Sequence, residues 1–311
     1  MLQTIFGCLI IIFYYCSNVS ASPLSTPADN NETSGEKHPP QHELLSPQTP
    51  LDKRLANERR TQWNKFVITP YKPTYVLPIA YDKKQNNQEK SLDNLEIKFQ
   101  FSLRVPLTRS IFGDNGFVSL GYTQVSYWQA YNSEASAVFR ETNFEPELML
   151  TFLNSTHIMN FKNRLITIGL VHQSNGKSQL ESRSWNRIYV DFVFEKQNFY
   201  LSIKPWYRFP ENDKDTPLDP TGDDNPNIEK YVGYGELSGI YKHDEQTYGF
   251  MLRNNLRSSE NKGAIQLDWT FPLHRRLIGY VQYFNGYGES LIDYNLYSNR
   301  LALGIMFTNW L

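Results

Sequence analysis

The chain has 311 residues and a formal net charge of −1, with 20% charged residues. This balance argues against a surface that binds nucleic acid or another polyanion, and the mean hydropathy of −0.53 is typical of a water-soluble protein. The aromatic residues point elsewhere, because 20 Tyr, 19 Phe and 6 Trp are a heavy share and Tyr and Trp suit membrane interfaces. Beyond the N-terminus no apolar run approaches the roughly 20 residues of a spanning helix, so any membrane crossing would use strands.

The N-terminus has the features of a secretory signal. Residues 5–15 form an apolar segment, and Val19-Ser20-Ala21 places small residues before a cleavage site. We therefore expect residues 1–21 to be a signal peptide that is removed after Ala21. Both cysteines lie in this segment, so we expect no disulfide in the mature chain.

The next segment has the composition of a leader. Residues 22–50 are rich in Pro, Ser, Thr, Asn and Glu and contain few apolar side chains. Such a segment cannot bury enough apolar surface to offset the entropy that is lost on ordering. We predict that residues 22–70 form a disordered or weakly structured periplasmic leader, in which residues 51–66 form a short polar helix.

From about residue 71 apolar and polar residues alternate. Between Leu95 and Val105, six apolar residues alternate with five polar ones, which indicates a strand with one apolar face. Pro205 lies inside another predicted strand, where it removes a ladder hydrogen bond, and the sequence gives no reason for it. The pattern predicts twelve strands, at residues 74–81, 94–105, 116–129, 141–153, 164–174, 184–195, 198–208, 229–242, 247–257, 262–270, 277–287 and 299–311.

The lengths of the connections between these strands alternate along the chain. Odd-numbered connections average about 11 residues and even-numbered ones about 6 residues, as in outer-membrane barrels, which have long loops at one end and short turns at the other. A β-sandwich with Greek-key crossovers has no reason to alternate in this way. The sequence therefore predicts an all-β fold over residues 71–311, a twelve-stranded antiparallel transmembrane β-barrel.

Polar side chains interrupt the apolar faces of the two strands between Ile166 and Phe194. His172 and Ser174 continue the apolar face of the first strand, and Asn186 begins the apolar face of the second. In a barrel this face points to lipid, so the three polar residues would lie at the outer wall, at the long-loop end. The side chains predicted to face the lumen are Lys98, Arg104, Arg187, Asp191, Glu195, Lys204 and Arg208.

A lone His-x-Ser at a strand end is most often an ordinary polar cap near the membrane border. Two observations favour a catalytic site. Polar residues on a lipid-facing stripe cost free energy and therefore tend to be functional. In addition, Asn186 reaches the same face beside His172. The three residues would form a triad, with Ser174 as nucleophile, His172 as base and Asn186 as the residue that orients the imidazole. Asp191 is excluded from the third role because its place in the strand directs it into the lumen.

The loop at residues 175–183 joins these two strands. Gly176 lies two residues after Ser174 and lets a backbone N–H approach a developing oxyanion. Ser178, Ser182 and the loop carbonyls are hard oxygen ligands of the kind that calcium accepts. Polar loops are mostly just solvated, so composition alone leaves both a calcium site and a plain surface loop open.

Six motifs in the predicted barrel are similar to one known family. They are Tyr122-Thr-Gln124, Asn132-Ser-Glu134, Phe139-Arg-Glu-Thr-Asn143, Val171-His-Gln-Ser-Asn-Gly-Lys-Ser178, Ser182-Arg-Ser-Trp-Asn-Arg187 and Tyr231-Val-Gly-Tyr-Gly-Glu-Leu237. From about residue 70 to its C-terminus the chain resembles the outer-membrane phospholipase A family. The resemblance implies a bacterial outer-membrane barrel of twelve strands. It also implies a calcium-dependent hydrolase that cleaves the sn-1 and sn-2 acyl esters of phospholipids and lysophospholipids.

The resemblance implies a role for each matching residue. Ser174 would be the nucleophile, His172 the base and Asn186 the orienting residue, while the Gly176 amide would donate to the oxyanion. Three ligands would hold the calcium ion, and they are the Lys177 carbonyl, the Ser182 hydroxyl and Ser136 of the partner subunit.

The resemblance further implies a homodimer as the active form. Gln124 corresponds to a buried interface glutamine of the family, and it shares the outward face of its strand with Leu120 and Tyr122. From the residues alone, Gln124 would be a polar residue tolerated in mid-strand. The partner's apolar flank would complete the groove for the acyl chain, and a two-fold pair would form two sites.

Two other interpretations stay open from the sequence. A barrel without hydrolytic activity would be a pore or a structural protein, although a lumen crowded with Arg, Lys, Glu and Tyr favours a filled barrel. A soluble lipid-binding sandwich would be released from membranes by high salt or carbonate. Conductance in a planar bilayer, set against lipase turnover, separates the pore from the enzyme.

Overall fold

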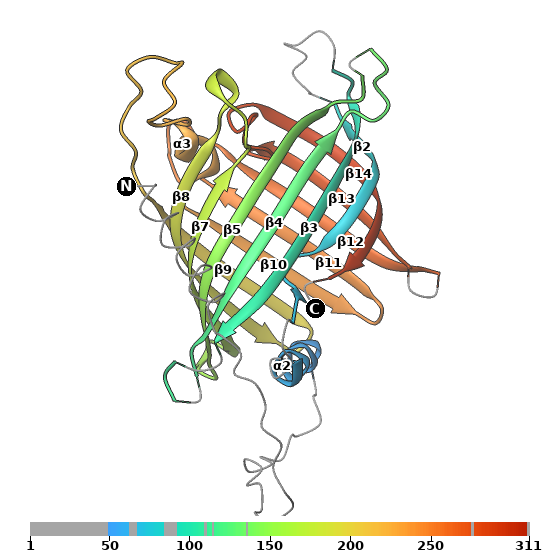
Figure 1. The fold of residues 1–311 in the computed structure, drawn as a ribbon. Coiled ribbons are helices and arrows are strands. Elements are labelled where there is room, and N and C mark those ends of the chain that lie inside the picture. The colour runs from blue at the N-terminus through green and yellow to red at the C-terminus, as the bar shows by residue number, and fades with distance from the viewer. Residues whose placement is uncertain are drawn as a thin grey trace, which may run out of the picture. The chain divides into compact units, whose positions relative to one another are not determined.

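The computed structural model describes residues 49–61, 67–83, 92–108, 111–113, 115–134, 136–274 and 277–309. Its strands form one antiparallel sheet that closes on itself (Figure 1), since β4 pairs with both β3 and β5. The twelve long strands are β2 (Thr74–Asp82), β3 (Leu95–Thr108), β4 (Phe117–Trp128), β5 (Phe139–Leu153), β7 (Phe161–Ser174), β8 (Ser184–Lys196), β9 (Phe199–Arg208), β10 (Gly235–His243), β11 (Gln246–Asn254), β12 (Gly263–His274), β13 (Leu277–Tyr287) and β14 (Tyr297–Thr308). Two short strands, β1 (Thr69–Pro70) and β6 (His157–Ile158), pair with β3 and β7.

The predicted twelve-stranded barrel is therefore confirmed. Closure gives every wall strand a hydrogen-bonded neighbour on both sides, as a hydrocarbon environment requires. Among the residues that the structure describes, no helix has the length and apolar character needed to cross a membrane. The predicted signal peptide at residues 1–21 and residues 22–48 of the leader lie outside the described residues and stay predictions.

Most predicted strand boundaries lie within four residues of the observed ones, and the largest error is at the start of β10. Residues 229–232 belong to a short helix, α3 (Ile228–Val232), and the strand predicted from residue 229 begins only at Gly235. The helix turns Ile228 and Val232 onto one side, where both are buried in the barrel core. Alternation of apolar and polar residues alone does not distinguish this turn of helix from the start of a strand.

The structure explains Pro205. The ladder between β8 and β9 is interrupted between the pairs Tyr189↔Trp206 and Phe192↔Ile203, and Pro205 lies in that interruption. On its other side, Pro205 is at the end of the ladder with β10, opposite Gly235. A missing N–H is tolerated where the ladder already ends or breaks.

The two faces of the wall alternate as the sequence predicts. Ile168 and Leu170 on β7 are 39% and 46% exposed on the outer surface, whereas Val171 is 6% exposed and packs in the lumen. Of the residues predicted to face inward, Lys98, Glu195 and Arg208 are buried. The outward face of β7 is therefore the face that meets lipid.

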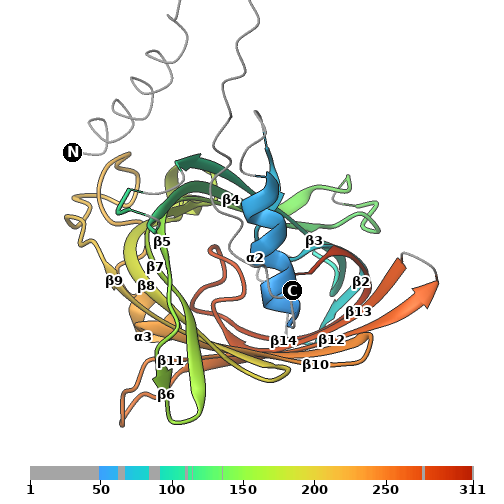
Figure 2. The same cartoon turned by 90° about the horizontal axis from the view of Figure 1, so that it is seen from below.

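Helix α2 (Pro50–Thr61) lies across one end of the barrel (Figure 2). Its Asp52 pairs with Arg164 at the start of β7, and Glu58 lies 2.5 Å from Arg104 on β3. Leu51 is fully buried. The predicted polar helix at 51–66 is thus present over 50–61, while residues 62–66 lie outside the described residues.

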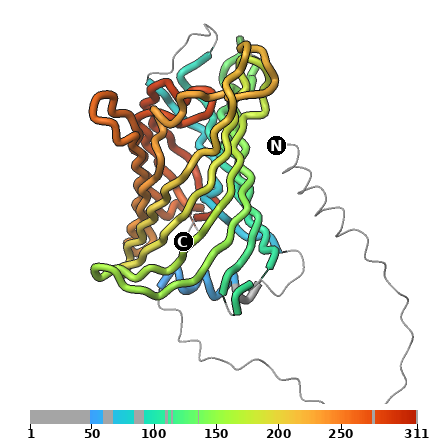
Figure 3. The backbone as a smooth tube through the Cα atoms, turned by 90° about the vertical axis from the view of Figure 1, so that its left-hand side faces the viewer, coloured from blue at the N-terminus to red at the C-terminus, as the bar shows by residue number. Residues whose placement is uncertain are grey.

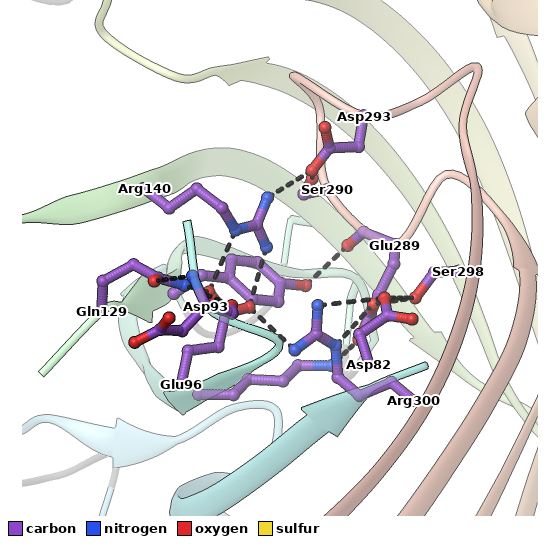
Figure 4. Close-up of polar contacts among 12 residues, drawn as sticks. Asp82, Asp93, Glu96, Gln129, Arg140, Glu289, Ser290, Asp293, Ser298 and Arg300 are labelled. Atoms are coloured by element: carbon purple, nitrogen blue, oxygen red, sulfur yellow. Dashed lines mark hydrogen bonds and ion pairs between the residues drawn. The ribbon is translucent and has the colours of Figure 1, made fainter. Parts of the chain in front are cut away.

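The long loops gather at the end of the barrel opposite α2, as Figure 3 shows for the segment between β9 and β10. At this end the lumen holds a buried ionic network (Figure 4). Arg300 lies 2.8 Å from Glu96, 2.9 Å from Glu289 and 3.3 Å from Asp82. Lys98 adds a second ion pair to Glu289 at 2.9 Å. The loop at residues 288–296 is therefore anchored inside the barrel by its Glu289 side chain.

A hydrophobic cluster lies behind the wall formed by β7 and β8. Val171, Trp185 and Tyr189 from these strands pack with Trp206 of β9. Ile228 and Val232 of α3 and two loop residues, Leu291 and Tyr294, complete the cluster. The Trp185 indole N–H donates to the Gln173 side-chain oxygen, Oε1, at 2.7 Å. The strands that carry the polar residues on the outside are thus held rigidly from the inside.

Candidate active site

His172 and Asn186 face each other across the β7–β8 ladder. They are direct cross-strand partners, and the His172 Nδ1 atom lies 2.8 Å from the Asn186 Oδ1 atom. Both side chains are half-buried. The amide oxygen therefore holds the imidazole ring in one orientation and accepts its Nδ1–H.

Ser174 lies two residues after His172 on the same outward face of β7. Its cross-strand partners are Phe144 on β5 and Ser184 on β8. Within the described part of the chain no hydrogen bond joins the Ser174 hydroxyl to the His172 ring. Nucleophile and base commonly come into hydrogen-bond contact only when substrate is bound. The sheet thus brings Ser174, His172 and Asn186 to one patch of the outer wall.

The other end of the Asn186 amide is also occupied. The Nδ2–H group donates to the Glu211 Oε1 atom at 3.0 Å. Glu211 is reached because the Phe209 N–H donates to the Asn186 carbonyl oxygen at 2.9 Å, which extends β9 along β8. Sequence reasoning missed Glu211, since the residue lies in a long loop where alternation gives no direction.

Charged neighbours surround Glu211. Burial raises the pKa of the Glu211 carboxyl above its usual range, and the Asp223 and Asp224 carboxylates raise it further. The hydrogen bond from Asn186 and the charge of Arg208 act in the opposite direction. The Asn186 amide is therefore one of the groups that stabilise the ionised form of this carboxyl.

Asn175 organises the loop at residues 175–183. Its Oδ1 atom accepts from the Arg183 N–H at 2.9 Å and from the Lys177 N–H at 3.3 Å, and its Nδ2 donates to the Glu181 carbonyl oxygen at 2.8 Å. Gly176 has φ of +67°, and a Cβ atom there would lie 3.1 Å from the Phe144 ring. Glycine fits this left-handed position beside Ser174 without strain.

A carboxylate stands next to the predicted calcium ligand Ser182. The Ser182 hydroxyl donates to the Asp224 Oδ2 atom at 2.7 Å, and the Ser184 hydroxyl lies 3.2 Å from the same atom. Lys214 approaches the other oxygen, Oδ1, at 2.5 Å. Hydroxyl, carboxylate and carbonyl oxygens are the ligands that calcium prefers. The composition of this donor set therefore fits calcium, and Asp224 is a second residue that sequence reasoning missed.

Clusters of acidic side chains in the described part of the chain give no further candidate for a metal site. No group of three or more His, Cys, Asp or Glu side chains suited to a metal ion occurs among the described residues. A calcium ion at Ser182 would therefore depend on hydroxyl and carbonyl oxygens beside the single Asp224 carboxylate.

The remaining two predicted residues lie apart from this cluster. Ser136 is exposed in the turn between β4 and β5, with φ of +55°. Gln124 is on the outward face of β4, where it accepts from the Tyr122 hydroxyl and donates to the Ser126 hydroxyl, both at 3.1 Å. Gln124 pairs with Phe144, which pairs with Ser174, so one row of cross-strand partners joins Gln124 to the cluster.

Fold and site together define a class: a membrane β-barrel that carries a Ser–His–Asn cluster on its lipid-facing wall. A model of the family described as Phospholipase A1 matches residues 51–307. The chain is 36% identical to Phospholipase A1 of Klebsiella pneumoniae in an alignment of 266 residues that covers 82% of this chain and 87% of that protein. The chain belongs to the outer-membrane phospholipase A family, and its barrel is a protein of the outer membrane.

Solved structures agree with this assignment. Outer membrane phospholipase A from Escherichia coli is similar with a TM-score of 0.74 and 34% identity, over 83% of this chain and 98% of that chain. The Salmonella typhi outer membrane phospholipase dimer with bound calcium has a TM-score of 0.72 and 34% identity, over 80% of this chain and 94% of that chain. An active-site mutant of the Escherichia coli protein is also similar, with a TM-score of 0.74.

Proposed function

We propose that this chain hydrolyses the sn-1 and sn-2 acyl esters of phospholipids and lysophospholipids through Ser174, His172 and Asn186. The observation that carries the proposal is the 2.8 Å contact between His172 and Asn186 on the outward face of the barrel. A nucleophile on this face meets the acyl esters of the surrounding lipid. The relatives named Phospholipase A1 support the same class of substrate.

The geometry supports an acyl-enzyme mechanism. Asn186 holds the Nδ1–H of His172, so the Nε2 atom is free to take the proton of the Ser174 hydroxyl as Oγ attacks the ester carbonyl. The proton then passes from Nε2 to the departing alkoxide of the lysolipid. His172 next deprotonates a water molecule, which attacks the acyl group and releases the fatty acid with recovery of Ser174.

Gly176 is the proposed oxyanion donor. Among the described residues nothing accepts a hydrogen bond from its backbone N–H. The loop that holds this N–H beside Ser174 is fixed by Asn175, so little reorganisation is needed when charge develops on the carbonyl oxygen.

We propose calcium as the cofactor. Ser182, the Lys177 carbonyl and Asp224 would hold the ion, together with Ser136 of the partner subunit. When bound, calcium supplies positive charge and polarised water next to the developing oxyanion. The solved Salmonella typhi dimer with bound calcium supports this proposal.

The direct test is fatty-acid release from phospholipid in mixed micelles, measured separately for the sn-1 and sn-2 positions. We expect release from both positions with calcium and loss of release with a chelator. The pore interpretation predicts the reverse result, which is steady conductance in a planar bilayer and no release. Conductance without release from the folded full-length chain would overturn the proposed function.

The homodimer is tested by crosslinking in detergent. If two copies meet across the face that carries Gln124, we expect calcium and substrate analogue together to increase the crosslinked dimer, and Gln124→Ala to reduce it. Thr247→Ala, a change on β11, is a control in another part of the wall. Full turnover by a protein that stays monomeric at every concentration would remove any role for Ser136 of the partner subunit.

A further inference from the structure

We propose that Glu211 is a positioning residue that locks the Asn186 amide in the one orientation able to serve His172. The inference rests on the proposed function, because it concerns the same site. Its basis is a chain of two contacts, 2.8 Å from His172 to Asn186 and 3.0 Å from Asn186 to Glu211.

An asparagine side chain has two ends of similar shape, and only one of them suits the proposed base. An ionised carboxylate accepts hydrogen bonds and donates none. Glu211 therefore requires the NH₂ group of Asn186 on its own side, which directs the Oδ1 atom toward the His172 ring. That oxygen in turn requires a proton on Nδ1 and leaves the lone pair on Nε2.

Without Glu211 the amide could rotate by half a turn. The NH₂ group would then face His172 and donate to Nδ1, and the ring proton would move to Nε2. In that tautomer Nε2 cannot accept the Ser174 proton. An aspartate in the third position needs no such lock, because both its oxygens accept. The asparagine of this site does need one.

Backbone hydrogen bonds of residues before and after Glu211 hold this carboxylate in place. The Phe209 N–H is bonded to the Asn186 carbonyl oxygen at 2.9 Å, and the Asp223 N–H donates to the Asn212 carbonyl oxygen at 2.7 Å. Arg208, next to Phe209, pairs with Asp223 at 2.5 Å. These contacts tie the start of the loop to its end and keep the Glu211 carboxylate against the amide.

Glu211 also adds charge where the mechanism uses it. When His172 takes the Ser174 proton, the ring becomes positive, and a neutral asparagine stabilises this charge less than a carboxylate would. Glu211 supplies a negative charge on the far side of the amide. The hydrogen bond from Asn186 and the charge of Arg208 favour the ionised form of Glu211, whereas the Asp223 and Asp224 carboxylates act against it.

The first experiment compares Glu211→Ala and Glu211→Gln with the control Asp213→Asn, which removes an exposed charge two residues away. We expect Glu211→Ala to lower kcat by about 10- to 100-fold, with KM within a factor of about two. Glu211→Gln should lose less, because its amide oxygen still accepts from Asn186.

The pH profile gives a second measurement on the same variants. The acid limb of the kcat/KM profile should move by about half a pH unit to lower pH in both variants, because the negative charge is lost. Wild-type kinetics in Glu211→Ala would overturn the inference and leave the proposed function standing.

The second experiment exchanges the two chemical groups. Asn186→Asp places a carboxylate against Glu211, and two carboxylates at this distance cannot both stay ionised. Adding Glu211→Gln removes the conflict and supplies a donor to the new carboxylate. We expect the double variant to be at least about 10-fold more active than Asn186→Asp alone. Additive losses would mean that Glu211 acts only through the stability of the loop.

A readout without turnover separates the inference from the proposed function. The ¹⁵N shifts of the His172 ring in the detergent-solubilised barrel report its tautomer directly. We expect a single Nδ1–H tautomer in the wild type and in Asp213→Asn, and a mixture in Glu211→Ala. A single Nδ1–H tautomer in Glu211→Ala would show that Asn186 needs no lock, even if the barrel hydrolyses lipid.

Discussion

Replacing Ser174 with Ala is expected to lower fatty-acid release by at least about 10⁴-fold, because the variant has no oxygen to attack the ester. His172 and Asn186 would remain bonded to each other, since their contact does not include Ser174. The Gly176 N–H, the proposed oxyanion donor, would also remain, so residual turnover would measure what it achieves without the nucleophile. The measurement is release of labelled acyl chains from mixed micelles at saturating calcium.

The control for Ser174→Ala is Ser155→Ala, an exposed serine in the turn between β5 and β7. It should retain the wild-type rate. Heat-modifiable migration in gels should show that both variants form the closed barrel. Substantial release by a folded Ser174→Ala protein would exclude Ser174 as the nucleophile.

Chelation of calcium is expected to lower the hydrolysis rate by at least about 100-fold, the effect of losing one stabilising group at an oxyanion. Chelation thus tests calcium dependence itself.

Two substitutions near Ser182 should change the calcium requirement in opposite directions. Asp224→Asn removes the carboxylate beside the Ser182 hydroxyl, so the calcium concentration for half-maximal activity should rise by about 10- to 100-fold. Lys214→Ala removes the ammonium group that lies 2.5 Å from the same carboxylate, so this concentration should fall.

Terbium luminescence offers a binding readout for the same variants, and Asp213→Asn serves as the matched control in the same loop. An unchanged calcium requirement in Asp224→Asn would place the ion elsewhere. Weaker calcium binding in Lys214→Ala would show that Lys214 supports the site instead of competing for it.

The sequence was sufficient for the barrel because the period-two pattern records which side of each strand meets lipid. Leu170 and Val171 illustrate this, since adjacent residues have 46% and 6% exposure. The pairing of His172 with Asn186 also followed from strand parity and the length of the loop between them.

Odd or even position predicts which face a side chain takes only within a strand, so it says nothing about residues in helices and loops. α3 was mistaken for a strand start because Ile228 and Val232 are buried by a helical turn and not by the sheet. Glu211 and Asp224 reach the site from the long loop at residues 209–234, whose course depends on contacts far apart in the chain, such as the pair Arg208–Asp223. No local sequence signal marks such residues.

The cross-strand pairing of His172 and Asn186 has a consequence for how the protein is made. The two residues meet only when β7 and β8 join in this register, and a slip of one residue would turn one of them into the lumen. On the proposed function, a chain still crossing the periplasm has no assembled triad and is harmless to the membranes it passes. Hydrolysis would then serve as a sensitive assay of correct insertion, because only a barrel that has completed its assembly is active.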